Sequence, residues 1–234
     1  MRTALVIPAL NEEEVIGETL ERIPPGVFST VMVVDNGSSD RTAEVAAACG
    51  AQVVREPIRG YGRACLRALA ALPESIDVLL FMQADLSEDP DESRSLIAPI
   101  ERGEADLVIG SRTLGYASPG ALLAHQRFGN WLATRLIRVF YGRRYTDLGA
   151  FRAIRRASLI ALGMRASQYA WTVEMQVRAI EAGLRVVEIP VSYKPRWAGV
   201  AKISGQVRAS IAAGVTILST IVHLWFLYRF SSKT

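Results

Sequence analysis

Short runs of apolar, often β-branched residues alternate with helical patterns along the first 110 residues of the chain. The runs predict five strands, at Thr3–Ile7, Thr30–Asp35, Ala51–Arg55, Val78–Met82 and Asp106–Gly110. Between them, a capping box at Asn11–Glu14 opens one helix, and Arg41–Cys49 and Gly62–Leu72 predict two more. Such alternation is typical of βαβ units around a mostly parallel sheet, so residues 1–110 predict the nucleotide-binding half of an α/β fold.

The pattern changes after Gly110. A loop is predicted at Gly115–Gly120, a long helix near Ala121–Phe140, a loop around Asp147 and a helix at Thr172–Ala182. We expect this second half, residues 111–205, to recognise an acceptor. No internal repeat or low-complexity linker separates the halves, so residues 1–205 predict a single domain.

Residues 206–234 predict an apolar C-terminal helix, in which 20 uncharged residues between Arg208 and Arg229 could just span a bilayer. On a helix these residues separate into a bulky stripe and a small, polar stripe. The bulky stripe is Ile211, Val215, Leu218, Val222 and Trp225, and the small one is Ala209, Ala213, Thr216, Thr220 and His223. This asymmetry favours a helix at the membrane interface or against a membrane-protein partner, with spanning and burial in the core left open.

Composition adds a setting for the protein. A chain of 234 residues, half of them apolar, can bury one large core. Cys49 and Cys65 lack metal-like spacing, and Met1–Ile7 runs directly into a strand without a cleavable signal, which predicts a reducing, cytoplasmic location. The net charge of +4 comes almost wholly from arginine, which suits phosphate contacts, although arginine-rich codon usage gives the same bias. We expect no nucleic-acid partner.

Three loops rich in small and polar residues adjoin the predicted strands: Pro8–Glu12, Asp35–Asp40 and Arg59–Arg63. Asp35 and Asn36 can contact a base or a ribose, Gly37 allows a left-handed turn, and Gly60 and Gly62 let backbone approach a ligand closely. Each signal is weak by itself, because an ordinary turn with a helix cap also explains such residues. Together they predict a nucleotide site at one edge of the sheet.

The apolar run Asp77–Met82 leads into Gln83-Ala84-Asp85, which places an acidic residue at the carboxyl end of a buried strand. Ligands bind at this edge of open α/β sheets, and a carboxylate there can anchor a divalent cation that carries phosphates. Gln83 offers a second oxygen. Glu88 and Asp89 are predicted to be a solvated loop residue and a helix cap before Pro90, although they could compensate for the missing charge at Gln83.

These motifs together resemble the family 2 glycosyltransferases of GT-A fold. The motifs are Ile7–Glu12, Val34–Thr42 and Ala84–Asp85, and the likeness is greatest to the branch of dolichol-phosphate mannose synthases and related polyprenyl-phosphate sugar transferases. The resemblance covers about residues 3–205 and continues through Gly110–Arg112, Thr146–Asp147, Phe151–Arg152, Trp171–Glu174, Glu188–Pro190, Arg196, Gly199 and Lys202. It implies a Rossmann-like GT-A fold and inverting transfer from a UDP- or GDP-sugar to a polyprenyl or dolichyl phosphate at the inner face of the cell membrane.

The resemblance also implies roles for individual residues. The nucleotide-binding set is Pro8, Ala9, Asn11, Glu12, Asp35, Asn36, Arg59, Gly62, Ala84 and Asp85, and the catalytic set is Asp85, Arg112, Arg127, Asp147 and Glu174. The cofactor is Mg²⁺ or Mn²⁺, held by Asp85 and Gln83, and it stabilises the leaving diphosphate. The family usually has Asp-x-Asp at this point, so the neutral Gln83 should weaken metal binding.

The nature of the acceptor decides what the protein must supply. A phosphate monoester is already ionised near neutral pH and needs no general base, and Arg112, Arg127, Arg196 and Lys202 could hold its phosphate. A hydroxyl acceptor would require a carboxylate base, for which Asp147 and Glu174 are the candidates by position. Structural ion pairing is an open alternative for Arg112, Arg127 and Glu174.

Two other functions stay open at this point: transfer to a hydroxyl acceptor, and a catalytically silent protein that binds nucleotide or lipid, as the substitution at Gln83 suggests. A nucleotidyltransferase or a dehydrogenase is disfavoured. Pro8-Ala9-Leu10-Asn11 occupies the turn where a glycine-rich loop would lie in those classes.

Overall fold

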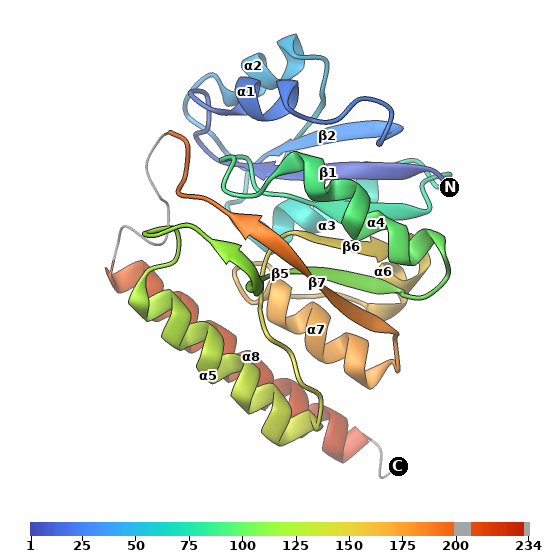
Figure 1. Cartoon of the computed structure of the whole chain (residues 1–234), viewed down its shortest axis with the longest axis vertical. Helices are drawn as coiled ribbons and strands as arrows, with labels where there is room; N and C mark the ends of the chain where they lie inside the picture. Colours follow the sequence, from blue (N-terminus) through green and yellow to red (C-terminus); the bar gives the residue numbers. More distant parts are fainter. Residues whose placement is uncertain (199–206, 232–234) are drawn as a thin grey trace.

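The computed structural model describes residues 1–198 and 207–231 (Figure 1). Its strands are β1 (Thr3–Ala9), β2 (Thr30–Asp35), β3 (Gln52–Arg55), β4 (Val78–Phe81), β5 (Leu107–Ala117), β6 (Arg152–Arg155) and β7 (Val186–Tyr193). Its helices are α1 (Ile16–Glu21), α2 (Thr42–Ala48), α3 (Tyr61–Ala71), the 3-10 helix η1 (Pro90–Glu92), α4 (Ser93–Glu101), α5 (Ala124–Tyr141), α6 (Arg156–Leu162), α7 (Trp171–Glu181) and α8 (Val207–Ser231). The predicted α/β class is confirmed.

The strands form one seven-stranded sheet in the order β3-β2-β1-β4-β6-β5-β7. All neighbours pair in parallel except β6, which is antiparallel to both β4 and β5. The chain moves outward from β1 to β3 and then returns to the other side of β1 with β4. This reversal creates the switch point at which open α/β sheets bind ligands, beyond the carboxyl ends of β1 and β4.

Two apolar layers cover the two faces of the sheet. One face packs against residues of α1, α2 and α4, such as Ile16, Ala46 and Leu96. The other packs against residues of α3 and α7, such as Ala68 and Trp171, and this layer continues into α5 and α8. Burial on both faces explains why the strands read as continuous apolar runs in the sequence.

Several predicted elements differ from the structure. The first helix begins at Ile16 instead of near Asn11, because Asn11 adopts a left-handed backbone with φ 52° and its side chain accepts from Ser39 N at 2.8 Å. The fifth strand continues to Ala117 with an irregularity between Ser111 and Tyr116, so the predicted loop at 115–120 starts too early. The hydrophobic pattern of the sequence does not predict α4, β6, α6 or β7.

Helix α8 runs beside α5 and also contacts α7 (Figure 1). Tyr141 Oη donates to Ile221 O at 3.2 Å, and the rings of Phe140 and Trp225 lie 5.1 Å apart between centroids. These contacts join the C-terminal end of α5 to the C-terminal half of α8, and the two helices run in the same direction (Figure 1). Residues 212–229 are long and apolar enough to cross a membrane, with a mean hydropathy of 1.3, but a single such helix is weak evidence by itself.

Candidate active site

The loops after β1 and β2 hold one another at the carboxyl edge of the sheet. Asn11 N donates to Ser38 Oγ at 3.0 Å, and Asn36 N donates to Ala9 O at 2.8 Å. The side chain of Asn36 donates to Ile58 O and accepts from Gly60 N at 2.7 Å. The side-chain amide of Asn36 therefore fixes the loop before α3. The sequence predicts a nucleotide contact for the same group. The Asp35 side chain accepts from Ser38 N through Oδ1, at 3.1 Å.

The glycines before and within α3 allow close packing of another chain segment. A Cβ at Gly60 would lie 2.2 Å from Ser167 O, and a Cβ at Gly62 would lie 1.9 Å from Ala166 O. The segment 166–168 therefore seats directly on the first turn of α3. The absence of a side chain at Gly62 makes room for the chain itself, and its predicted contact with a nucleotide stays a prediction.

Asp85 lies in the loop after β4, as predicted. Its Oδ1 accepts from Ser87 Oγ at 2.6 Å and from Ser87 N at 3.1 Å. Ser87 Oγ also lies 3.5 Å from Gln83 Oε1, so the side-chain oxygens of Asp85 and Gln83 converge on one hydroxyl. The backbone of Ala84 is anchored by Thr19 Oγ1, at 2.8 Å.

Arg196 joins two of these loops. Its guanidinium makes an ion pair with Glu12, in the loop after β1, and its Nη1 lies 3.4 Å from Asp85 Oδ2. The next residue strengthens the attachment, because Trp197 N donates to Asp85 O at 3.1 Å. A positive charge is therefore held between the two carboxylates nearest the switch point. The sequence placed Arg196 among the phosphate-binding residues but did not predict these two partners.

Glu88 was predicted to be a solvated loop residue, and this is wrong. Its side chain is buried, with 3% of the residue exposed, and Oε2 accepts from Gln83 N at 2.8 Å. Burial, together with the negative charge of nearby Asp85, raises the pKa of Glu88 to about 8. Asp89 does cap the following turn, since it accepts from Asp91 N, and it also pairs with Lys194.

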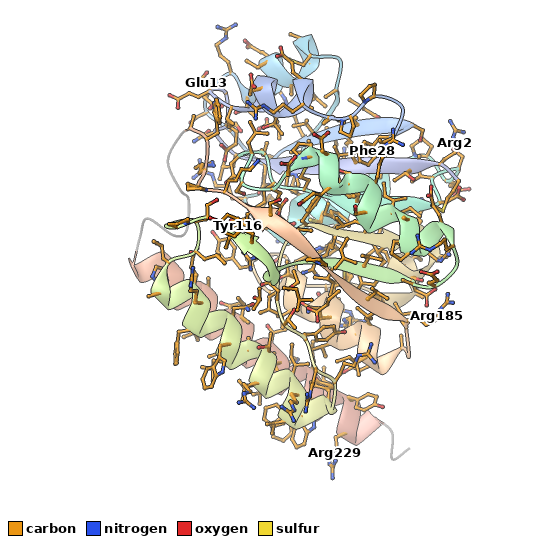
Figure 2. All side chains as sticks on the ribbon, in the orientation of Figure 1. Arg2, Glu13, Phe28, Tyr116, Arg185 and Arg229 are labelled. Atoms are coloured by element: carbon orange, nitrogen blue, oxygen red, sulfur yellow. The ribbon has the colours of Figure 1, made fainter. Side chains whose placement is uncertain are left out.

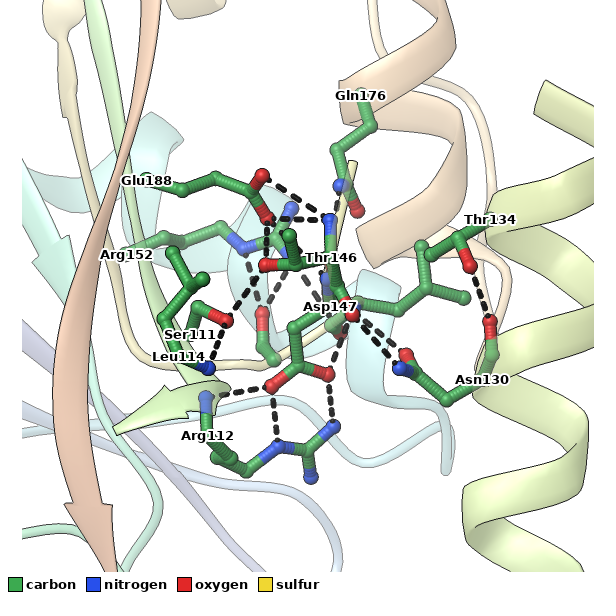
Figure 3. Close-up of polar contacts among 12 residues, drawn as sticks. Ser111, Arg112, Leu114, Asn130, Thr134, Thr146, Asp147, Arg152, Gln176 and Glu188 are labelled. Carbon is green, nitrogen blue, oxygen red and sulfur yellow. Dashed lines mark hydrogen bonds and ion pairs between the residues drawn. The ribbon is translucent and has the colours of Figure 1, made fainter. Parts of the chain in front are cut away.

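Arg112 and Asp147 form a bidentate ion pair in the acceptor half (Figure 3). Arg112 Nε lies 2.8 Å from Oδ2, Nη2 lies 2.6 Å from Oδ1, and the backbone N of Arg112 also donates to Oδ2. The Asp147 side chain is 1% exposed. Burial opposes the charge of Arg112, but the hydrogen bonds and charge of Asp147 outweigh it and raise the pKa of that guanidinium above its usual value.

A second set of residues fixes Asp147 from behind, and the sequence gave no role to most of them. Glu188 accepts from Thr146 N and Asp147 N, and Gln176 Nε2 donates to Asp147 O at 2.9 Å (Figure 3). The fully buried Arg152 donates to the carbonyls of Gly149 and Thr172. Apart from the family motifs at Thr146–Asp147, Phe151–Arg152 and Glu188–Pro190, the sequence signal for this network is a polar residue at an apolar strand position, such as Arg152 in β6.

Both carboxylates considered as a general base are already engaged. Asp147 accepts from Arg112 and from Leu148 N. Glu174, at 3% exposure, accepts from Ala166 N at 2.7 Å, from Arg165 N and from Arg178 Nε at 2.8 Å. Glu174 thus holds the segment that seats on α3. The structural interpretation of Glu174 is correct, and its catalytic assignment finds no support in this geometry.

The other predicted site residues lie in several separate elements. Arg127 lies exposed at the start of α5, where its Nε donates to Leu122 O at 3.3 Å. Arg59 is exposed in the loop before α3, and its carbonyl accepts from Gln168 Nε2. Pro8 and Ala9 end β1. Lys202 lies outside the described residues.

The residues after β4 fit a hard divalent cation in chemistry, although with few charges. Asp85 and Gln83 both offer oxygen, the ligand type that Mg²⁺ and Mn²⁺ prefer. The hydroxyl of Ser87 already contacts both side chains, and the guanidinium of Arg196 lies near Asp85. Among the described residues, no group of three or more His, Cys, Asp or Glu side chains could by itself hold a metal. Most of the coordination would have to come from the ligand and water, as is usual for Mg²⁺ with phosphates.

The fold and these loops define a nucleotide-sugar transferase. The family model described as "Glycosyl transferase family 2" matches residues 4–163, and the chain belongs to this family. An uncharacterized glycosyltransferase of Mycobacterium tuberculosis is 39% identical over 211 residues, covering 89% of this chain and 93% of that protein.

Two relatives with named activities are each 32% identical to this chain. They are an undecaprenyl-phosphate mannosyltransferase of Micrococcus luteus, with 92% of this chain and 93% of that protein covered, and a polyprenol monophosphomannose synthase of Mycolicibacterium smegmatis, with 88% and 82% covered. The recognition made from the loop motifs is confirmed, and the chain is a family 2 glycosyltransferase that uses nucleotide sugars.

A solved structure with the same fold is glucosyl-3-phosphoglycerate synthase from Mycobacterium tuberculosis, in complex with Mn²⁺, uridine diphosphate and phosphoglyceric acid. It superposes with a TM-score of 0.75 at 23% identity, covering 96% of this chain and 78% of that chain. The same enzyme has also been solved with Mg²⁺ and uridine diphosphate. The GT-A-like architecture is therefore confirmed.

Proposed function

We propose that this protein transfers a sugar, with inversion, from a UDP- or GDP-sugar to a polyprenyl phosphate. The observation that carries the proposal is the state of Asp147 and Glu174. A hydroxyl acceptor needs a base to take its proton, and both candidate carboxylates are instead held by arginine and backbone donors. A phosphate acceptor is ionised already and removes that need. The two relatives named after polyprenyl-phosphate products support the same acceptor class.

Arg112 is well placed to hold an acceptor or donor phosphate. Its Nε and Nη2 are oriented by Asp147, and no described residue accepts from its Nη1. The Tyr193 ring lies 5.0 Å from the guanidinium carbon and supports its face. An arginine whose plane is fixed in this way presents its remaining N–H groups to phosphate with little further loss of entropy.

The donor would lie at the switch point, against the loops that follow β1, β2 and β4. Asp85, with the amide oxygen of Gln83, would hold Mg²⁺ or Mn²⁺, which would neutralise charge on the departing nucleoside diphosphate. Arg196 supplies a second positive charge at the same point, since it already pairs with Glu12 and approaches Asp85. Gln83 removes one carboxylate from this site, so we expect the metal to bind mainly together with the donor.

The test is donor turnover by the purified protein with Mg²⁺ or Mn²⁺ and a panel of UDP- and GDP-sugars. Three acceptor conditions are compared: a short polyprenyl phosphate, the matching polyprenol and no acceptor. Release of nucleoside diphosphate only with the phosphate supports the proposal and identifies the donor. Equal release with the polyprenol would favour a hydroxyl acceptor, and nucleotide binding without any release would favour a silent protein.

A further inference from the structure

Acidic and basic residues are segregated along this chain. Residues 107–146 and 189–234 contain no Asp or Glu, yet they hold 12 of the 27 Lys and Arg residues. The rest of the chain holds 15 Lys and Arg and all 23 acidic residues. The modest net charge of +4 therefore conceals an acidic body joined to two strongly basic segments. Those two segments contain α5 and α8, the helices that lie side by side.

Helix α5 is apolar on two opposite faces. Ala133 and Ile137 are buried against the core, as expected of a helix packed on a domain. The outward face also carries large apolar side chains: Phe128, Trp131 and Val139 are 60%, 53% and 74% exposed. Phe128 and Trp131 stack, with ring centroids 5.8 Å apart. A helix whose core face is already satisfied has no folding reason to expose three such residues.

Arginines flank the exposed apolar residues of α5. Arg135 and Arg138 are both exposed on this face, and the guanidinium of Arg135 lies 5.8 Å from the Trp131 ring. Arg143 and Arg144 follow directly after the helix and are also exposed. Within the part of the chain that the structure describes, none of these four arginines forms an ion pair with a carboxylate.

Helix α8 continues this surface. Its inward side chains Ala213, Ile221 and Leu224 are buried, whereas Val215 is 62% exposed and Phe226 and Leu227 are about half exposed. Two outward-lying hydroxyls bond within the helix: Ser219 Oγ donates to Thr216 O at 3.1 Å, and Thr216 Oγ1 donates to Ala212 O at 2.8 Å. Figure 2 shows Arg229 at the C-terminal end of this two-helix layer.

We infer that the outward surface of α5 and α8 docks onto an anionic lipid bilayer and lies in its headgroup layer. We call this surface the platform: Phe128, Trp131, Val139, Val215, Phe226 and Leu227, with Arg135, Arg138 and Arg229. Aromatic and aliphatic side chains between arginines match the interface of such a bilayer, where rings enter the headgroup region and cations meet lipid phosphates.

The charges and the packing disfavour two alternatives to this mode of binding. A second copy of the chain would bring two copies of the same arginine-bearing surface together, and neither α5 nor α8 contains an Asp or Glu that could pair with those arginines. A spanning α8 would have to leave α5 and α7 and expose the face that now buries Ile221 and Leu224. The platform therefore binds at the surface of the bilayer and does not cross it. This inference does not depend on which sugar or acceptor the enzyme uses.

The test is co-sedimentation of the full-length protein with vesicles of phosphatidylcholine alone or with about 30% phosphatidylglycerol. Binding is expected with the anionic vesicles, and 1 M NaCl should release most of the protein, because salt screens surface charges. Bound protein should also show fluorescence quenching by lipids brominated near the headgroup. Resistance to extraction by alkaline carbonate, or equal binding to neutral vesicles, would overturn a peripheral, charge-dependent mode.

Matched variants locate the contact. Trp131→Ser and Arg138→Glu should each weaken binding to anionic vesicles by about tenfold. The controls are Ile160→Ser, which removes an apolar residue of equal exposure (53%) on α6, and Arg67→Glu, which reverses an exposed charge on α3; both should bind as the unmodified protein does. Unchanged binding by the two platform variants would refute the assignment.

A measurement of molar mass separates the bilayer from a second copy of the chain. Sedimentation velocity without lipid should give a monomer for the unmodified protein and for Trp131→Ser. A dimer that dissociates in Trp131→Ser would show that the platform binds another copy, and would overturn the proposal. Donor hydrolysis without lipid should be equal in the platform variants and the controls, which separates a membrane defect from a failure of the enzyme.

Discussion

The guanidinium of Arg196 lies 3.4 Å from Asp85 Oδ2 and pairs at the same time with Glu12. A cation of the protein thus stands beside the carboxylate on which a metal would depend. Because positive charges repel, the free protein should bind Mg²⁺ weakly, and a diphosphate should strengthen that binding by drawing Arg196 toward its own charge. The metal and the donor are therefore expected to bind together.

Gln83→Asp should restore the second carboxylate and raise the affinity for Mn²⁺ in the presence of nucleoside diphosphate by about tenfold, or ~1.4 kcal/mol. Isothermal titration of Mn²⁺ into the variant and the unmodified protein measures the difference. Gln83→Glu adds the same charge on a side chain longer than that of aspartate, so it controls for the position of the carboxylate. An affinity unchanged in Gln83→Asp would show that Gln83 does not face the metal.

Asp85→Ala should lower turnover by about 10²–10³-fold, because the charge that develops on the leaving diphosphate loses its cation. The folded state should be little affected, since Asp85 sits in a loop and its main partner is the neighbouring Ser87. Asp91→Ala, an exposed carboxylate six positions along the chain, is the control and should retain full turnover. Near-normal activity of Asp85→Ala would mean that the metal site is wrongly assigned.

Asp147→Asn should destabilise the fold by about 3 kcal/mol, because it leaves the charge of Arg112 buried without its partner. Chemical denaturation measures the free energy of unfolding. Glu104→Gln breaks a bidentate pair of the same type, with Arg102, but on the surface, and it should leave the denaturation midpoint unchanged. Equal effects of the two substitutions would contradict the importance of burial at Asp147.

Gly62→Ala should lower the free energy of unfolding by about 2 kcal/mol or more, because its Cβ would lie 1.9 Å from the backbone oxygen of Ala166. Gly129→Ala, in the helix α5, meets open space and should be neutral or stabilise the protein by about 0.5–1 kcal/mol. The comparison is made on thermal and chemical unfolding. If Gly62→Ala folds as stably as Gly129→Ala, the segment 166–168 does not pack on α3 in this way.

Glu88 should make stability depend on pH. Its pKa is raised to about 8 by burial, so the folded protein keeps a proton that the unfolded chain loses from about pH 5 upward. The free energy of unfolding should therefore fall by about 1.4 kcal/mol per pH unit through that interval and level off above pH 8. Glu88→Gln cannot lose a proton there and should remove this slope when unfolding is measured without metal or nucleotide. An equal slope in both proteins would refute a protonated Glu88.

The first half of the fold could be predicted because each strand is buried on both faces and bounded by turn residues. β2 was predicted at the observed bounds, and β1, β3 and β4 within two residues. The strands of the second half were harder: β6 has only four residues and contains Arg152, whose burial depends on carbonyl acceptors in two other segments. No local sequence pattern predicts that such a residue belongs to a strand.

The candidate site shows the same limit. Asp85 could be placed from the strand before it, because its position at the sheet edge follows from local sequence. The partners of Arg196, the burial of Glu88 and the engagement of Glu174 all depend on segments that meet only in the folded chain. The close approach of Ala166 to Gly62 is a further contact of this kind, because it joins segments that are distant in the sequence.

The central claim is that the acceptor oxygen belongs to a phosphate and that no protein carboxylate activates it. Mass spectrometry and ³¹P NMR of the lipid product, made from polyprenyl phosphate and the donor identified by turnover, test it most directly. The account predicts a sugar joined through a phosphodiester, with the anomeric configuration opposite to that of the donor. A sugar attached to a hydroxyl, or retention of configuration, would contradict it.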